Sequence, residues 1–480
     1  MDLNRPIHAL FDVRRQIPVG EALGEIPQSR QIYADVIRIA WPSVIEMVTM
    51  SMISFIDTWL VSSLNEESIA AVGLVSQPRM LMMALFFALN VGVTAIVARR
   101  KGEGRQADAN TTLRNAILLI SVLSIGMMAL GLSISTFLMN LAGAKADTLV
   151  DSRTYFEVTT WFLPVNTLTI CICAAQRGVG NTRLTLNVNI VSNLVDLLFS
   201  YLLINGYAGL PRLGVAGAAW GTGVGFVAGL GMALATVFGR RHGEGFFHLS
   251  LADNWRPDIR TLREIGKVGS GAALEQVAFR IGFFSYAVIV ANLGTAVFAA
   301  HQICAQFQNL SYTFGDGIGV AGTSLVGQSL GRKRPDMAKL YGLASQRLAM
   351  VVALVMAVSI VVFRYPLVRI FSDDPYIVGL AANVMLLLAI FQPLQTSSVV
   401  VSGALRGAGD TGYVARVMIL CVAVMRPLLA LLAVYLLENV FGLPEIALMG
   451  AWAAAVIDMA TRVTLVYRRF RGGKWCDIKV

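Results

Sequence analysis

The chain has 480 residues, of which 56% are hydrophobic and only 14% charged, and its mean hydropathy is +0.66. A soluble domain of this length needs more charge to cover its surface, so these values exclude a soluble globular protein. The net charge of +10 would suggest nucleic-acid binding in a soluble domain. Apolar runs of about 20 residues recur along the chain, each long enough to cross about 30 Å of hydrocarbon. The runs are continuous rather than alternating, which predicts membrane helices, not barrel strands, and no nucleic-acid partner.

The first 35 residues lack an apolar core and are predicted to form a cytoplasmic arm rather than a signal peptide. Twelve spans follow in chain order. They are predicted at about residues 37–63, 70–98, 113–140, 154–176, 184–206, 215–238, 265–292, 298–326, 345–371, 377–404, 413–437 and 447–467.

Lysine and arginine cluster in the loops after even-numbered spans, as in Arg99-Arg100-Lys101 and Arg332-Lys333-Arg334, and are sparse after odd-numbered spans. The positive-inside rule then places both termini in the cytoplasm, and we expect a bacterial inner-membrane location. Residues 239–264 are polar and divide six spans from six, so they are interpreted as a linker. The predicted parts are an arm (1–35), an N-lobe (36–238), the linker (239–264), a C-lobe (265–470) and a tail (471–480).

The two halves repeat each other at an offset of 229 residues. Arg177-Gly178-Val179-Gly180-Asn181-Thr182 matches Arg406-Gly407-Ala408-Gly409-Asp410-Thr411, and Glu46 falls over Glu275. Because each half has an even number of spans, both copies face the same way. They are predicted to be related by an axis along the membrane normal, with a cavity between them. This symmetry favours alternating access, and a duplicated channel is the alternative; a monomer surrounded by lipid is expected.

Four motifs carry a family resemblance over roughly residues 35–470. They are Asp57-Thr58-Trp59-Leu60-Val61-Ser62, Ala299-Ala300-His301-Gln302, Leu325-Val326-Gly327-Gln328-Ser329-Leu330-Gly331 and Gly403-Ala404-Leu405-Arg406-Gly407-Ala408-Gly409-Asp410-Thr411. The chain resembles the multidrug and toxic compound extrusion (MATE) family. The resemblance implies an all-α membrane protein with two six-helix lobes around a central cavity. It also implies export of small organic, mostly cationic or amphipathic compounds, driven by Na⁺ or H⁺ entry.

An ionisable side chain in hydrocarbon is costly and therefore marks a candidate site. Asp57, late in the first span, is the first candidate, because its carboxylate can hold Na⁺ together with other oxygens or can carry a proton. The alternative is an Asp that reaches the outer surface. By resemblance, the family's fifth helix often carries an Asn and, four residues later, an Asp; these slots hold Asp196 and Ser200 here, so one carboxylate remains but has moved by one turn, and Thr222 matches a hydroxyl ligand. We predict one cation or proton-coupling cluster, with interhelical hydrogen bonding as the alternative for its neutral members: Asp57, Asn193, Asp196, Ser200 and Thr222.

The second half departs from one family branch, whose acidic pair falls here on Phe279 and Gln395. Five polar residues in the spans are interpreted as cargo contacts or structural groups: Glu46, Glu275, Asp316, Gln395 and His301. Asp458 and Arg462 lie four residues apart and are predicted to form an ion pair.

No nucleotide-binding loop, dinucleotide fingerprint, metal-ligand cluster or nucleophile motif is recognisable, so neither an enzyme nor a cofactor beyond the coupling ion is expected. The same carboxylates serve Na⁺ or H⁺. A flippase for lipid-linked precursors is the alternative function. It would need a cationic cavity for pyrophosphate, for which four arginines are available: Arg79, Arg280, Arg416 and Arg426.

Overall fold

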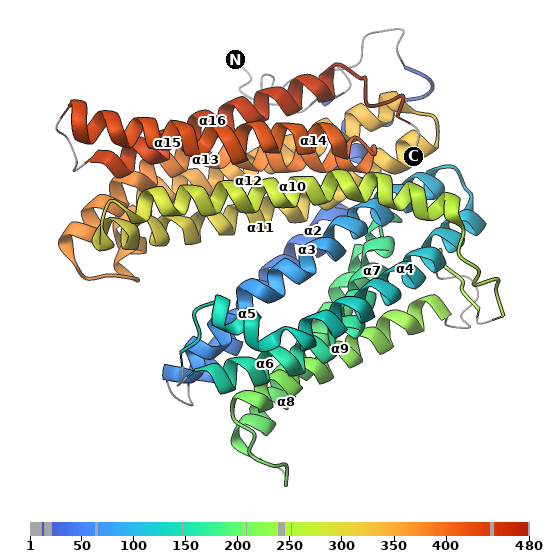
Figure 1. Cartoon of the computed structure of the whole chain (residues 1–480). Coiled ribbons are helices and arrows are strands. Elements are labelled where there is room, and N and C mark those ends of the chain that lie inside the picture. The colour runs from blue at the N-terminus through green and yellow to red at the C-terminus, as the bar shows by residue number, and fades with distance from the viewer. Residues whose placement is uncertain are drawn as a thin grey trace. The chain divides into compact units, whose positions relative to one another are not determined.

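A computed structural model describes residues 12–13, 22–62, 66–145, 148–207, 209–238, 245–250, 252–441 and 446–478. Much of the predicted arm and part of the linker lie outside these residues. Within them the chain is helical and contains no strand (Figure 1).

Within the described residues, nine of the predicted spans fall on single helices, and the other three, 113–140, 154–176 and 413–437, each cover consecutive helical segments. The helices of the first half are α2 (Ser29–Ser62), α3 (Glu66–Gly102), α4 (Gln106–Ser133), α5 (Ser135–Leu141), α6 (Leu149–Trp161), α7 (Leu163–Gly178), α8 (Thr182–Asn205) and α9 (Val215–Phe238). Those of the second half are α10 (Ile259–Ala291), α11 (Thr295–Gly331), α12 (Pro335–Arg369), α13 (Pro375–Gly407), α14 (Thr411–Met418), α15 (Arg426–Tyr435) and α16 (Ala447–Arg471), with π-helical turns η2 (Ile419–Met425) and η3 (Leu436–Val440).

The span count agrees with the sequence only approximately. Among the described residues, ten helices are long and apolar enough to cross a membrane, and α6 with α7, bent by 50°, makes eleven. The bend lies at Phe162, next to Pro164 in the first turn of α7, where a proline is tolerated but cannot continue the preceding hydrogen-bond ladder. The remaining long helix, α11, has 37 residues and carries the glycine- and glutamine-rich motifs that lower its hydropathy.

The chain packs as two compact units. The N-half unit contains Ile45–Gly269, and the C-half unit contains Met1–Val44 with Ser270–Val480. These divisions fall inside α2 and α10, whereas the sequence analysis placed the lobe boundaries in the flanking segments.

In the C-half unit, the beginning of α2 packs on helices from the second half of the sequence. Ile32, Val36 and Ile39 share a core with residues of α11, α12 and α13. The Tyr341 hydroxyl donates to Asp35 Oδ2 at 2.9 Å. The first turns of α2 are thereby anchored to α12.

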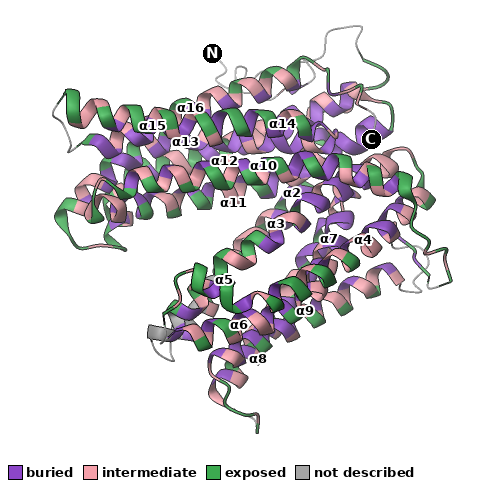
Figure 2. Cartoon of the chain, in the orientation of Figure 1, coloured by how far each residue is buried: buried purple, intermediate pink, exposed green. Residues whose placement is uncertain are grey.

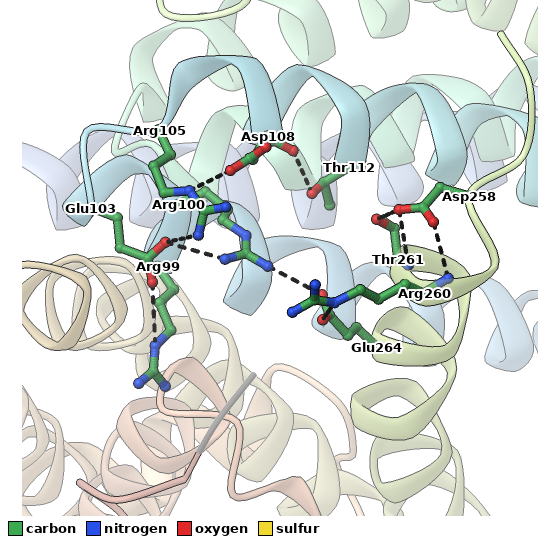
Figure 3. A network of polar contacts seen from close by, with 10 residues as sticks. All are labelled: Arg99, Arg100, Glu103, Arg105, Asp108, Thr112, Asp258, Arg260, Thr261 and Glu264. Atoms are coloured by element: carbon green, nitrogen blue, oxygen red, sulfur yellow. Dashed lines mark hydrogen bonds and ion pairs between the residues drawn. The ribbon is translucent and has the colours of Figure 1, made fainter. Parts of the chain in front are cut away.

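In the N-half unit, the beginning of α10 is held by a polar network (Figure 3). Arg100, at the end of α3, pairs with Glu264 at 3.3 Å and with Glu103 at 3.2 Å. Asp258 precedes α10, and its backbone N–H donates to Asn115 Oδ1 on α4 at 2.7 Å. These contacts connect the predicted cytoplasmic loops of the first half to the start of the second half.

Burial follows the pattern of a membrane protein (Figure 2). In the C-half unit, α13 packs against α11, α12 and α16, and its side chains fill the interior. On α12, by contrast, Leu354, Val355 and Val358 are exposed although they are apolar. Such faces are expected where side chains contact lipid tails rather than water.

Candidate functional site

The first-half cluster is built on two closely packed helices, α8 and α9. Asp196 and Ser200 lie one turn apart on α8, and Ser200 Oγ donates to Asp196 Oδ1 at 2.9 Å. A Cβ on Gly221 of α9 would collide with Ser200, and one on Gly225 would lie 2.7 Å from the Asp196 Cβ. These glycines therefore allow the backbones to approach, as small residues do between membrane helices.

Thr222, on α9, completes this part of the cluster. Its hydroxyl donates to the Ala218 carbonyl at 3.1 Å and also interacts with Asp196. Both Asp196 and Thr222 are buried. The carboxylate of Asp196 thus lies among hydroxyl oxygens inside the N-half unit.

Asp57 joins the cluster from α2. Its carboxylate interacts electrostatically with Asp196, and the guanidinium of Arg79 acts on both carboxylates. Asp57 Oδ1 is buried and has no hydrogen-bond partner among the described residues. A buried carboxylate oxygen without a partner is costly, so this atom is the natural point for a proton or cation to bind.

Two members of the cluster were not assigned to it from the sequence. Arg79, on α3, lies with its Cζ 5.7 Å from the Phe226 ring. Tyr155, on α6, interacts with Arg79, Asp57, Asp196 and Thr222. Arg79 was recognisable as a charge inside a span, but its partner was not, and nothing in the sequence distinguishes Tyr155 from other span tyrosines.

The structure therefore brings together Asp57, Asp196, Ser200 and Thr222. Asn193 lies three residues before Asp196 and is partly buried, but in the described part of the chain it forms no hydrogen bond with them. No group of three or more His, Cys, Asp or Glu side chains able to hold a metal is found in the described residues. A hard cation here would have to be shared between carboxylates and neutral oxygens.

Glu46 forms a separate site in the N-half unit. Its Oε1 accepts from Arg177 Nη1 at 3.2 Å and from Asn189 Nδ2 at 2.8 Å. Its Oε2 accepts from Thr185 Oγ1 at 2.8 Å. The carboxylate is 1% exposed and saturated with donors, which indicates a structural role that joins α2 to α7 and α8.

Glu275 is the repeat counterpart in the C-half unit and is less well satisfied. Arg406 Nη1 donates to its Oε1 at 2.8 Å, whereas its buried Oε2 has no hydrogen-bond partner within the described residues. At the offset of 229 residues, Thr185 and Asn189 correspond to Val414 and Met418, which cannot donate. The partner Arg406 comes from α13, whereas Glu275 lies on α10.

The remaining candidates of the second half lie in the C-half unit. Asp316 is exposed on α11 and interacts electrostatically with Arg406 and Glu275. Gln395 is fully buried, and its Nε2 donates to the Gln308 carbonyl at 3.2 Å. His301 is buried, with its ring 5.6 Å from the rings of Tyr286 and Trp452. The predicted Asp458–Arg462 ion pair is confirmed, at 3.4 Å.

Comparisons with known proteins agree with this arrangement. The MatE family model matches residues 42–202 and 272–432, one match in each half. The chain is 26% identical over 454 residues to the probable multidrug resistance protein NorM of Thermotoga maritima, covering 94% of both chains. It is 24% identical to the multidrug resistance protein MdtK of Pectobacterium atrosepticum, over 90% of this chain and 94% of that one. A solved outward-facing multidrug resistance MATE family transporter superimposes with a TM-score of 0.83 at 21% identity, over 92% of this chain and 97% of that one.

Proposed function

Since this chain belongs to the MatE family and is an integral membrane transporter, we propose that it is a secondary active antiporter. It exports small organic, cationic or amphipathic compounds in exchange for Na⁺ or H⁺ by alternating access. We expect it to work as a monomer among lipids in the bacterial inner membrane, with both termini in the cytoplasm. The names of its multidrug-resistance relatives support the class of cargo.

The observation that carries the proposal is the charge balance of the first-half cluster. Asp57 and Asp196 contribute two negative charges and Arg79 one positive charge, so the cluster has one negative charge in excess. A single charge in hydrocarbon costs at least about 2.5–3.5 kcal/mol. Binding of one Na⁺ or one proton removes this excess, and the unpartnered Asp57 Oδ1 provides an acceptor for either.

Coupling follows if the cluster binds the cation or proton in one conformation and releases it in the other. A ligand shifts a conformational equilibrium only by its differential affinity for the two states. An ion bound to Asp57 and Asp196 would alter how α2, α8 and α9 pack, because Asp196 lies at the contact between α8 and α9 and Asp57 interacts with it from α2. The repeat supports rocking of one half against the other as the accompanying motion.

A lipid-linked precursor flippase is less well supported. Arg426 is 1% exposed and paired with Asp458, and the charge of Arg79 acts on Asp57 and Asp196. Arg426 is therefore too deeply buried to meet a group as large as a pyrophosphate, and Arg79 is already opposed by two carboxylates.

The test is transport of a fluorescent organic cation by proteoliposomes under a Na⁺ gradient and, separately, under a pH gradient. Asp57→Asn is expected to abolish gradient-driven transport with unchanged thermal unfolding. Asp151→Asn, on α6 outside the cluster, is the matched control and is expected to transport normally. Gradient-driven efflux by Asp57→Asn at the wild-type rate would refute the coupling role.

A further inference from the structure

Inside the C-half unit lies a buried charge cluster that the proposed transport cycle does not use. Asp458 Oδ2, on α16, accepts from Arg426 Nε at 2.8 Å and from Arg462 Nη2 at 3.4 Å. The three residues are 0–2% exposed. Arginine stays protonated in proteins, so two guanidinium groups and one carboxylate leave one positive charge in excess.

An aromatic box surrounds Arg426. Its Cζ lies 4.9 Å from the centre of the Phe283 ring and 5.9 Å from the rings of Tyr286 and Phe391. Cation–π attraction from these rings offsets part of the cost of burying the guanidinium but adds no negative charge. His301, beside Tyr286, can only add positive charge.

The same interior contains polar groups that point to a ligand. Trp452 Nε1, Tyr286 Oη and Arg462 Nε are buried, and none has a hydrogen-bond partner among the described residues. Trp452 packs 6.4 Å from Phe391 and 5.6 Å from His301, so its indole lies beside the aromatic box. The residues of the box together with Trp452, Asp458 and Arg462 are called the chamber below. Asp458 Oδ1 is an unpartnered acceptor there. The chamber nevertheless combines a positive excess with buried N–H and O–H donors, and such donors need an acceptor.

The internal repeat relates this chamber to the first-half cluster. At the offset of 229 residues, Tyr286 falls over Asp57 and Met425 falls over Asp196. The π-helical turn η2 immediately precedes Arg426, and a π-turn accommodates one extra residue. With that residue inserted, Arg426 takes the place of Asp196. The structure supports the correspondence. The guanidinium of Arg426 lies beside the ring of Tyr286, and the carboxylate of Asp196 interacts with that of Asp57.

The path of η2 depends on a close helix contact. A Cβ on Gly282 of α10 would collide with the Val422 carbonyl in η2. Glycine therefore lets α10 lie directly against the π-turn, and Phe283 and Tyr286 follow on α10 within reach of Arg426.

We propose that the C-half interior binds one small monovalent anion of the size of chloride, held by Arg426 and the donors Trp452 Nε1 and Tyr286 Oη, while Arg462 supplies the positive excess through its shared partner Asp458. One such anion cancels the single positive excess, as one monovalent cation cancels the negative excess of the first-half cluster. The site lies within one unit and does not depend on the coupling role of Asp57.

The test measures thermal unfolding of the purified full-length chain while chloride replaces gluconate at constant sodium and ionic strength. Chloride is expected to raise the midpoint saturably, by about 2 °C or more. Arg462→Met removes the positive excess and should abolish the rise. Arg416→Met removes the same charge from an exposed position on α14 and should keep it.

Trp452→Phe provides a second variant that keeps the aromatic packing. Loss of one N–H donor to an anion should raise the half-saturating chloride concentration about tenfold or more. Bromide is expected to give an anomalous-scattering peak beside Arg426 in a crystal of the protein. The proposal is overturned if wild type unfolds at the same temperature in chloride and gluconate, as it would if the chamber held water only. It is also overturned if Arg462→Met keeps the full chloride response.

Discussion

Replacing each of the repeat-related glutamates by alanine should have unequal effects on stability. Glu46→Ala removes an acceptor shared by Arg177, Asn189 and Thr185 in a buried site and leaves the last two with only backbone carbonyl acceptors within α8. Breaking a buried ion pair on one side costs about 3–5 kcal/mol. Glu275→Ala releases only Arg406, whose side chain is 21% exposed and can be hydrated, as that of Arg177 can at 18%, but it deprives no further side-chain donor of an acceptor. A lost hydrogen bond to a charged group then costs about 1.5–3 kcal/mol.

The two variants should therefore differ by about 2 kcal/mol, which corresponds to a difference of about 4–8 °C in unfolding midpoint for a unit of this size. The assay is thermal unfolding of both purified variants in the same detergent and buffer, scanned at one rate because membrane proteins often unfold irreversibly. Equal midpoints, or a lower midpoint for Glu275→Ala, would show that the additional donors around Glu46 do not stabilise the fold.

Two further stability predictions follow from single positions. Gly221→Ala places a methyl group into Ser200 and should lower the free energy of unfolding by about 1–3 kcal/mol. Gly231→Ala, on the same helix with nothing within 4 Å of the added Cβ, should raise it by about 0.5–1 kcal/mol. A lower unfolding midpoint for Gly231→Ala than for Gly221→Ala would contradict this. Asp258→Ala removes the cap of α10 and should lower the midpoint by an amount equivalent to about 0.5–2 kcal/mol near pH 7. The hydrogen bond from the Thr261 hydroxyl holds the pKa of Asp258 below its ordinary value, so its contribution is present above about pH 4 and should vanish as the pH falls further. A wild-type-minus-variant difference that persists unchanged down to pH 2 would disprove the assignment.

The helices were predictable because the hydrocarbon requires long apolar runs, and the repeat was predictable because its motifs are continuous in sequence. The positions where helices are interrupted were not predictable. The bend at Phe162 is followed two residues later by Pro164, and the end of the π-turn Ile419–Met425 is followed two residues later by Pro427, so a neighbouring proline does not distinguish the bend from the π-turn. The position of the π-turn depends on the contact between Gly282 and Val422, which are far apart in sequence.

The candidate site was predictable only in part, for a similar reason. A carboxylate in a membrane span is rare because its transfer into hydrocarbon costs free energy, so Asp57 and Asp196 could be identified from the sequence. Their partner Arg79 comes from a different helix, and helical spacing cannot pair residues across helices. Glu275 illustrates the same limit, since Arg406 lies 131 residues away in sequence.

The two halves show how a duplicated fold can keep one site and change its polarity. Asp57 and Asp196 in the first half correspond to Tyr286 and Arg426 in the second, once the extra residue of η2 is counted. In each half one charge has no counter-charge. Arg79 is the single cation beside two carboxylates, and Asp458 is the single anion beside two guanidinium groups. A fully paired interior would have no use for an ion, whereas an interior short of one charge is stabilised whenever an ion of the right sign enters. The same internal position is therefore suited to a small cation in one half and to a small anion in the other.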